Sequence, residues 1–342
     1  ASVVAQAANP LLATWTGPYG GVPPWDQVRA SDFEPAFEAA IAARRAEYLA
    51  IANSAEPATF DNTIAAMERS GQLLDRVGSM FGVMTSNIGG EVYDALDASI
   101  SPKQAVADDE ITFNPALFAR IERVYQNRAS LNPEQRRLTE LTYESFVRQG
   151  ARLNPAQKQQ LGQINEQLAS LFAEFSAKVT ADGNRHVLVE READLAGMPA
   201  NMIAAFRAAA ARRDIAQGFA VDNTRSSVEA VLTSASNRSL RERVWRQFVN
   251  RGDGADANDT NEVIRRILEL RAARARLLEY PSHAHWRMSN TMARDPQAAM
   301  DLMMRVWRPA VARVNEEVAD MRALARRDGL AGAFEPWDYL YY

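Results

Sequence analysis

The sequence predicts a mainly α-helical protein with one small strand-helix-strand excursion near residues 186–222. Four helix starts are marked by a side-chain acceptor followed by proline, at Asn114, Asn132, Asn154 and Asp295. The acceptor caps the helix, and proline in the first turn lacks only an N–H that would be unpaired there anyway. Long apolar stripes of helical period are a second observation, and a third is that only 186–190 and 218–222 have the pattern of strands, with a helix over 200–212 between them.

The elements follow from local signals. Ser31 and Glu34 predict a capping box for a helix that ends near Ala52. Apolar stripes predict long helices over 155–180, 260–279 and 296–327. In the last of these, Met300, Met303 and Met304 lie at helical spacing and are predicted to fill the core. Long helices joined by short loops predict a helical stack or bundle.

Composition narrows the possible functions. The chain has 342 residues, 47% of them hydrophobic and 24% charged, as is typical of a folded globular protein. Its net charge is -4, and its arginines alternate with acidic residues along predicted helices, which favours solvated helix faces over a nucleic-acid surface. It has no cysteine, so disulfides and thiolate zinc ligands are excluded. No run of about 18 apolar residues predicts a membrane span.

The domain organisation is predicted to be simple. Residues 1–13 are expected to be a leader or extended tail, and 14–342 a single helical portion. Ala5-Gln6-Ala7 has the small-x-small pattern of a signal-peptidase site, which favours a periplasmic location. An alanine-rich leader on a cytoplasmic protein is the alternative.

The residues that usually carry chemistry do not assemble into a site. The chain has three histidines and no His-Glu-x-x-His motif. His283 and His285 are two apart on a predicted helix and point about 200° apart, so they cannot share one ion; His186 opens a strand and is expected at its edge. The acidic run at Asp108, Asp109 and Glu110 is predicted to be a solvated helix face.

Other motifs are also absent. The serine nucleophile elbow and the phosphate-binding loop do not occur. The acidic stretch 252–259 has Ile264 where a calcium loop needs glutamate, so it is predicted to be an inter-helix loop. No catalytic or metal-binding residue is therefore predicted in this chain, and the substrate-binding residues stay unknown.

The last nine residues are rich in aromatic rings, which dominate buried contacts. We expect these rings to form an interface with a part of the polypeptide beyond this chain; they belong to Phe334, Trp337, Tyr339, Tyr341 and Tyr342.

Several segments, spread in order along nearly the whole chain, resemble the bacterial peptidyl-dipeptidases, or dipeptidyl carboxypeptidases, of the thimet oligopeptidase family of zinc metallopeptidases. They are Asn9-Pro10-Leu11-Leu12, Gly17-Pro18-Tyr19-Gly20-Gly21, Thr59-Phe60-Asp61-Asn62-Thr63, Leu141-Thr142-Tyr143-Glu144, Leu277-Leu278-Glu279-Tyr280-Pro281 and Pro336-Trp337-Asp338-Tyr339. The chain resembles the N-terminal half of such an enzyme.

The resemblance implies the long-helix N-terminal half of a two-lobed helical metallopeptidase, in which this chain supplies scaffold and one wall of a deep channel. Zinc would be bound outside this chain, by the C-terminal catalytic half of the same polypeptide. Short unstructured peptides would be the substrates, with removal of C-terminal dipeptides, and no nucleic-acid or membrane partner is expected. This chain alone would be inactive. An oligopeptidase that cuts internally, or a non-catalytic helical peptide-binding module, is the alternative.

Overall fold

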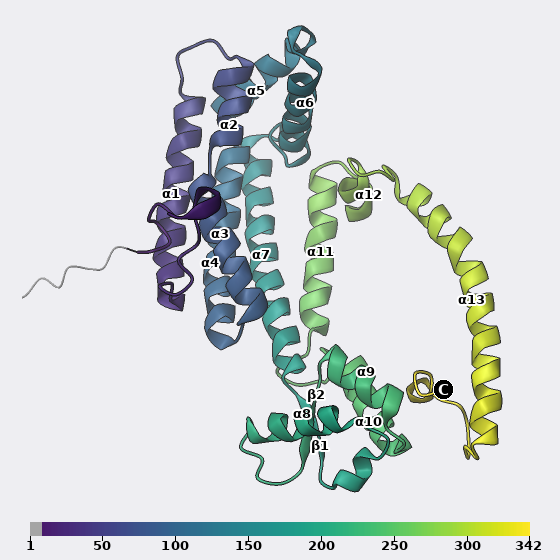
Figure 1. The fold of residues 1–342 in the computed structure, drawn as a ribbon. Coiled ribbons are helices and arrows are strands. Elements are labelled where there is room, and N and C mark those ends of the chain that lie inside the picture. The colour runs from purple at the N-terminus through teal and green to yellow at the C-terminus, as the bar shows by residue number, and fades with distance from the viewer. Residues whose placement is uncertain (1–8) are drawn as a thin grey trace, which may run out of the picture. The chain divides into compact units, whose positions relative to one another are not determined.

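The computed structural model describes residues 9–342 and confirms a mainly α fold (Figure 1). Ala5-Gln6-Ala7 lies outside the described residues. The chain forms two compact units where the sequence predicted one portion. The first unit contains the residues up to Glu174 together with Arg265–Trp286, and the second contains Phe175–Ile264 and Arg287–Tyr342.

The first unit is built from helices. They are α1 (Phe33–Ala52), α2 (Ala65–Arg69), α3 (Gln72–Asn87), α4 (Glu91–Thr112), α5 (Pro115–Gln126), α6 (Pro133–Arg148), the first part of α7 (Pro155–Gly183), most of α11 (Asn261–Leu277) and the start of α12 (His283–Met288). Helix α1 packs on α3 and α4 (Figure 1). Phe33 and Phe37 of α1 meet Phe81 of α3 edge-to-face, with ring centroids 5.2 and 5.4 Å apart.

The expected leader is wrong at its C-terminal end. Leu11 is fully buried in the core formed by α1, α3 and α4. The side chain of Asn9 holds this segment in place, because its Nδ2 donates to the Asp32 carbonyl at 2.8 Å and its Oδ1 accepts from the Leu11 N–H. Residues 9–13 are therefore tied to the first unit.

All four predicted acceptor-proline starts are confirmed, at α5, α6, α7 and α13 (Pro296–Arg327). The capping box at Ser31 and Glu34 is wrong. The chain enters α1 through a short 3-10 turn, Ala30–Asp32, in which Asp32 accepts from the Arg29 N–H at 2.7 Å. Glu34 instead accepts from Ser99 and Lys103 of α4, so a tertiary contact replaces the local one.

The second unit contains the predicted strand-helix-strand excursion. Strands β1 (His186–Val189) and β2 (Phe219–Asp222) pair antiparallel, with His186 opposite Asp222 and Val189 opposite Phe219. Helices α8 (Ala200–Ala211), α9 (Arg225–Ser234) and α10 (Arg238–Val249) pack around this pair. The acidic stretch 252–259 is the predicted loop between α10 and α11.

Helix α13 has the predicted bounds but not the predicted environment. Met300, Met303 and Met304, expected in the core, are 40–53% exposed. The periodic stripe was correctly interpreted as a helix face, but within the described part of the chain no residue covers it enough to bury it.

Candidate functional site

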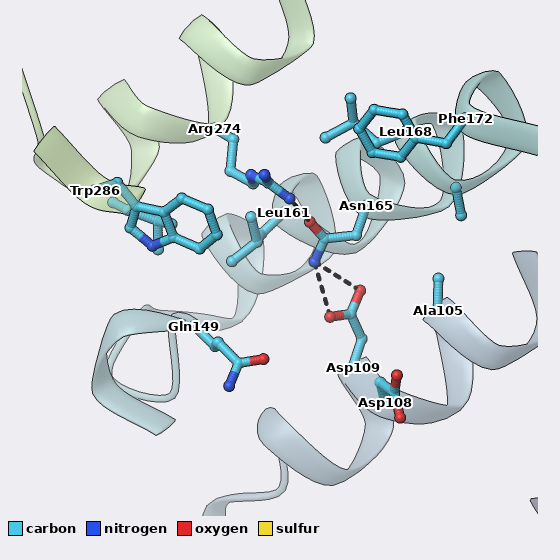
Figure 2. Close-up of a pocket in the computed structure, with 12 residues that line it drawn as sticks. Ala105, Asp108, Asp109, Gln149, Leu161, Asn165, Leu168, Phe172, Arg274 and Trp286 are labelled. Carbon is cyan, nitrogen blue, oxygen red and sulfur yellow. Dashed lines mark hydrogen bonds between the residues drawn. The ribbon is translucent and has the colours of Figure 1, made fainter. Parts of the chain in front are cut away.

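A pocket in the first unit is the best-defined candidate site (Figure 2). Its volume is about 250 Å³. It lies where side chains of α4, α7, α11 and α12 converge, and it is lined by Ala105, Asp108, Asp109, Gln149, Leu161, Asn165, Leu168, Ala169, Phe172, Arg274, Leu278 and Trp286. We call it the Asp109 pocket.

Three polar residues from three helices form a chain of hydrogen bonds in this pocket. Asn165 Nδ2 donates to both carboxylate oxygens of Asp109, at 2.8 and 3.1 Å, as Figure 2 shows. Arg274 donates from its guanidinium to Asn165 Oδ1 at 3.3 Å. Asn165 therefore links the Asp109 carboxylate on α4 to the Arg274 guanidinium on α11.

Asp109 is a perturbed acid. Its pKa is raised to about 6: burial raises it most and the charge of Asp108 also raises it, whereas the Asn165 hydrogen bonds and the Arg274 charge lower it. Desolvation of the carboxylate is thus the largest cause. At pH 7 Asp109 is mostly ionised, but a modest fall in pH protonates it.

The opposite wall is aromatic and held rigidly. The Arg274 guanidinium lies over the Trp286 ring at 4.5 Å. Trp286 Nε1 donates to the Arg148 carbonyl at 2.9 Å, and the Arg148 side chain donates to the Trp286 carbonyl at 2.7 Å. This reciprocal pair fixes α12 on α6.

The Asp109 pocket therefore combines an acid, an amide, a guanidinium and apolar walls. Such groups can donate hydrogen bonds to a peptide C=O and accept them from a peptide N–H. This combination of groups is suited to binding a polar ligand with apolar flanks.

Sequence reasoning missed this site. Asp109 was interpreted as part of a solvated face, and that prediction is wrong because α7 covers it with Asn165. Asp108 and Glu110 are exposed as predicted. The available signal was the helical stripe of α7, in which Asn165 follows the buried Ile164 and precedes the buried Leu168.

The histidines lie outside the pocket lining. His285 Nδ1 is 2.8 Å from Ser282 Oγ at the start of α12, where a helix was predicted. His283 packs on Trp286 with ring centroids 5.4 Å apart. His186 opens β1. Within residues 9–342, no group of three His, Asp or Glu side chains is arranged to hold a metal ion, so the residues present do not fit a zinc site.

The C-terminal rings are only partly available for an interface. Trp337 is 8% exposed, because it packs on α10 with its ring 5.5 Å from that of Trp245 and with Arg246 over its face at 5.0 Å. This chain therefore already covers Trp337, contrary to the expectation. Tyr339 is exposed, and Phe334, Tyr341 and Tyr342 are half-buried, so an interface through these four stays a prediction.

A buried ion network fixes this segment. Asp338 is fully buried and accepts from Arg238 at 2.8 Å and from Arg241 at 2.9 Å. Burial acts to raise the pKa of Asp338, but the hydrogen bonds from Arg238, the Glu335 N–H and Arg241 together lower it below its usual value. Arg241, itself 2% exposed, also donates to the carbonyls of Ala235 and Trp337.

The chain is similar to known peptidases. The model of peptidase family M3 matches residues 231–342. The dipeptidyl carboxypeptidase of Escherichia coli is 34% identical over 98% of this chain, and that of Salmonella typhimurium is 31% identical over the same share. Residues 231–342 thus match peptidase family M3, and nearly the whole chain is similar to dipeptidyl carboxypeptidases. This confirms the resemblance to the dipeptidyl carboxypeptidases of this family.

The chain spans about half the length of the relatives it matches: the match covers 49% of the Escherichia coli dipeptidyl carboxypeptidase. Oligopeptidase A of Escherichia coli is 26% identical, again over 98% of this chain and 49% of the relative. In the part of the chain that the structure describes, no helix has the length and apolar character needed to cross a membrane.

Proposed function

We propose that this chain is the N-terminal part of a peptidyl-dipeptidase of family M3, which removes dipeptides from the C-termini of short unstructured peptides. One observation carries the choice of activity. Dipeptidyl carboxypeptidases match at 34% and 31% identity, whereas oligopeptidases A match at 27% and 26% over the same share of the chain. Internal cleavage is the second candidate, because those oligopeptidases match along the same 98%.

The proposed contribution of this chain is scaffold and peptide contact. The Asp109 pocket offers the polar groups and apolar walls that a peptide needs, and the zinc ion of the proposed activity would be held by residues outside this chain. The described residues supply no ligand set for it. By itself the chain is proposed to be inactive, and its partner is proposed to be the C-terminal half of the same polypeptide.

The test uses the polypeptide that continues past Tyr342. It is incubated with two versions of one peptide, with a free and with an amidated C-terminus, and the products are identified by mass spectrometry. We expect dipeptides from the free form, no product from the amidated form, and loss of activity with a chelator. Equal internal cleavage of both forms would establish the second candidate.

The chain alone gives a complementary measurement. Turnover of the free peptide by residues 1–342 would contradict the proposed inactivity. Peptide binding without turnover, by both this chain and the longer polypeptide, would favour a binding module.

A periplasmic location is proposed from Ala5-Gln6-Ala7 alone. Sequencing the mature N-terminus of the native protein tests it. A new N-terminus just after Ala7 would support export, and an intact upstream sequence would contradict it.

A further inference from the structure

Helix α13 is a long helix that lacks cover. It runs for 32 residues, and Ala325 alone among them is buried. Every residue from 300 to 316 is exposed. Its first turn is nevertheless well formed, because Asp295 Oδ1 caps it by accepting from the Gln297 N–H at 2.7 Å.

The exposed residues include a continuous apolar stripe. At about 100° per residue, its six members fall within an arc of about 100°. Each is 39–62% exposed, and we name them the α13 stripe: Met300, Met303, Met304, Trp307, Val311 and Val314. On the same helix, a groove of about 570 Å³ is lined only by Met300, Leu302, Met303, Met304, Val306, Trp307 and Ala310. Proteins rarely leave such a contiguous apolar surface in water.

Proline marks the side of α13 that faces away from the stripe. Pro309 lies almost opposite the stripe on the helical wheel. Its ring clashes with the carbonyl four residues earlier, which opens the helix on its own side and bends it toward the stripe. Figure 1 shows α13 curved. Helices that wrap a core bend in this sense, with the convex side toward solvent.

We propose that the α13 stripe is the docking surface for the part of the polypeptide that follows this chain. The inference rests on the proposed function, in which residues 1–342 are the N-terminal part of a longer peptidase. The relatives contain about as much chain again as the matched region. A covalently attached segment has a high effective concentration at the stripe, which a second copy lacks.

The occupant should be apolar at its centre and acidic at its edge. Arg308 lies next to the stripe on the helical wheel, and carboxylates on the occupant could pair with it there. This surface differs from the predicted one at the C-terminal rings, of which Trp337 is already covered.

Methionine oxidation by peroxide tests the proposal, because the reaction follows exposure of the sulfur. Residues 1–342 and the longer polypeptide are oxidised in parallel and mapped by mass spectrometry. We expect Met300, Met303 and Met304 to oxidise about tenfold more slowly in the longer polypeptide. Met80, which is 1% exposed, is the internal control and should be slow in both.

Equal oxidation of the three methionines in both polypeptides would overturn the proposal. So would protection that rises with the concentration of residues 1–342 alone, since that identifies a second copy as the occupant. Peptidase assays on the same samples keep the two proposals separate. Dipeptide release with unprotected methionines refutes the docking surface alone, and protection with only internal cleavage refutes dipeptide release alone while supporting docking.

A matched pair of variants on the same helix gives a second measurement. Trp307→Asp places a charge in the stripe, and Arg305→Asp places one on the polar side. We expect Trp307→Asp to lower the melting temperature of the longer polypeptide by several degrees and to change that of residues 1–342 by about a degree or less. Arg305→Asp should change neither by more than that. Equal small effects of both variants in the longer polypeptide would contradict docking.

Discussion

Replacing Asp109 by asparagine should stabilise the protein relative to wild type, and this stabilisation should be larger at neutral pH than at acid pH. The pKa of Asp109 is raised from 3.8 to about 6, mainly by burial. The folded state therefore binds this proton more tightly than the unfolded state does. Stability from the protonated form is complete below the unfolded pKa and is lost as pH rises toward the folded pKa.

The size of this loss follows from the shift. A difference of about 2 pKa units at about 1.4 kcal/mol per unit gives roughly 3 kcal/mol. Asp109 is only partly buried, so about 1–3 kcal/mol is the expected range. Asparagine cannot ionise and can still accept from Asn165 Nδ2, so Asp109→Asn avoids the loss while keeping the hydrogen bond.

Thermal unfolding of both proteins at pH 4.5 and pH 7.5 measures the effect. The melting temperature of Asp109→Asn minus that of wild type should rise by several degrees between the two pH values, at about 2–4 °C per kcal/mol. The control is Asp26→Asn, which removes an exposed carboxyl group from the same unit. Its difference from wild type should stay constant. The reasoning is refuted if Asp109→Asn and Asp26→Asn show the same pH dependence.

Three further variants test other parts of the structure. Asp338→Asn leaves the buried Arg241 guanidinium without its charge partner and should cost roughly 3–5 kcal/mol of unfolding free energy. The control Glu229→Gln loses only an exposed pair with Arg225 and should cost little. Denaturant titration followed by tryptophan fluorescence compares the two variants. Asn132→Ala removes the α6 cap and should cost about 1 kcal/mol, and Asn132→Ser should recover most of it in the same titration. Gly197→Ala should destabilise the second unit, because φ is +88° there and a Cβ would lie 2.4 Å from the Ser234 carbonyl oxygen; a melting temperature equal to wild type would contradict this.

Local signals predicted the elements well because they depend on neighbouring residues. Asn114, Asn132, Asn154 and Asp295 each cap a helix through contacts two or three residues away. The strand pair was recoverable because alternating burial at Val187 and Val189 is also local. Where a long-range partner competes, prediction failed: Glu34 turns from its expected capping role to Ser99 and Lys103, about 65 residues away.

The candidate site was not predictable by the same means. The pKa of Asp109 depends on the cover given by α7 and on the charge of Arg274, which is 165 positions away along the chain. Nothing in the run Asp108, Asp109, Glu110 distinguishes the middle residue, since adjacent helical positions point in different directions. Only the packing of α4 against α7 selects it.

Helix α13 and the segment after it differ sharply in burial. The Asp338 carboxylate is fully buried between Arg238 and Arg241, an arrangement whose desolvation cost is offset only by good geometry. That network fixes the chain eleven residues beyond the end of α13, while Asp295 caps the first turn of the helix. The helix is therefore well formed at its start and is followed by a fixed segment, yet the α13 stripe stays in water. An apolar face exposed along a well-formed helix is explained by a partner that docks there, which is why the methionines on it are the most informative probes of the longer polypeptide.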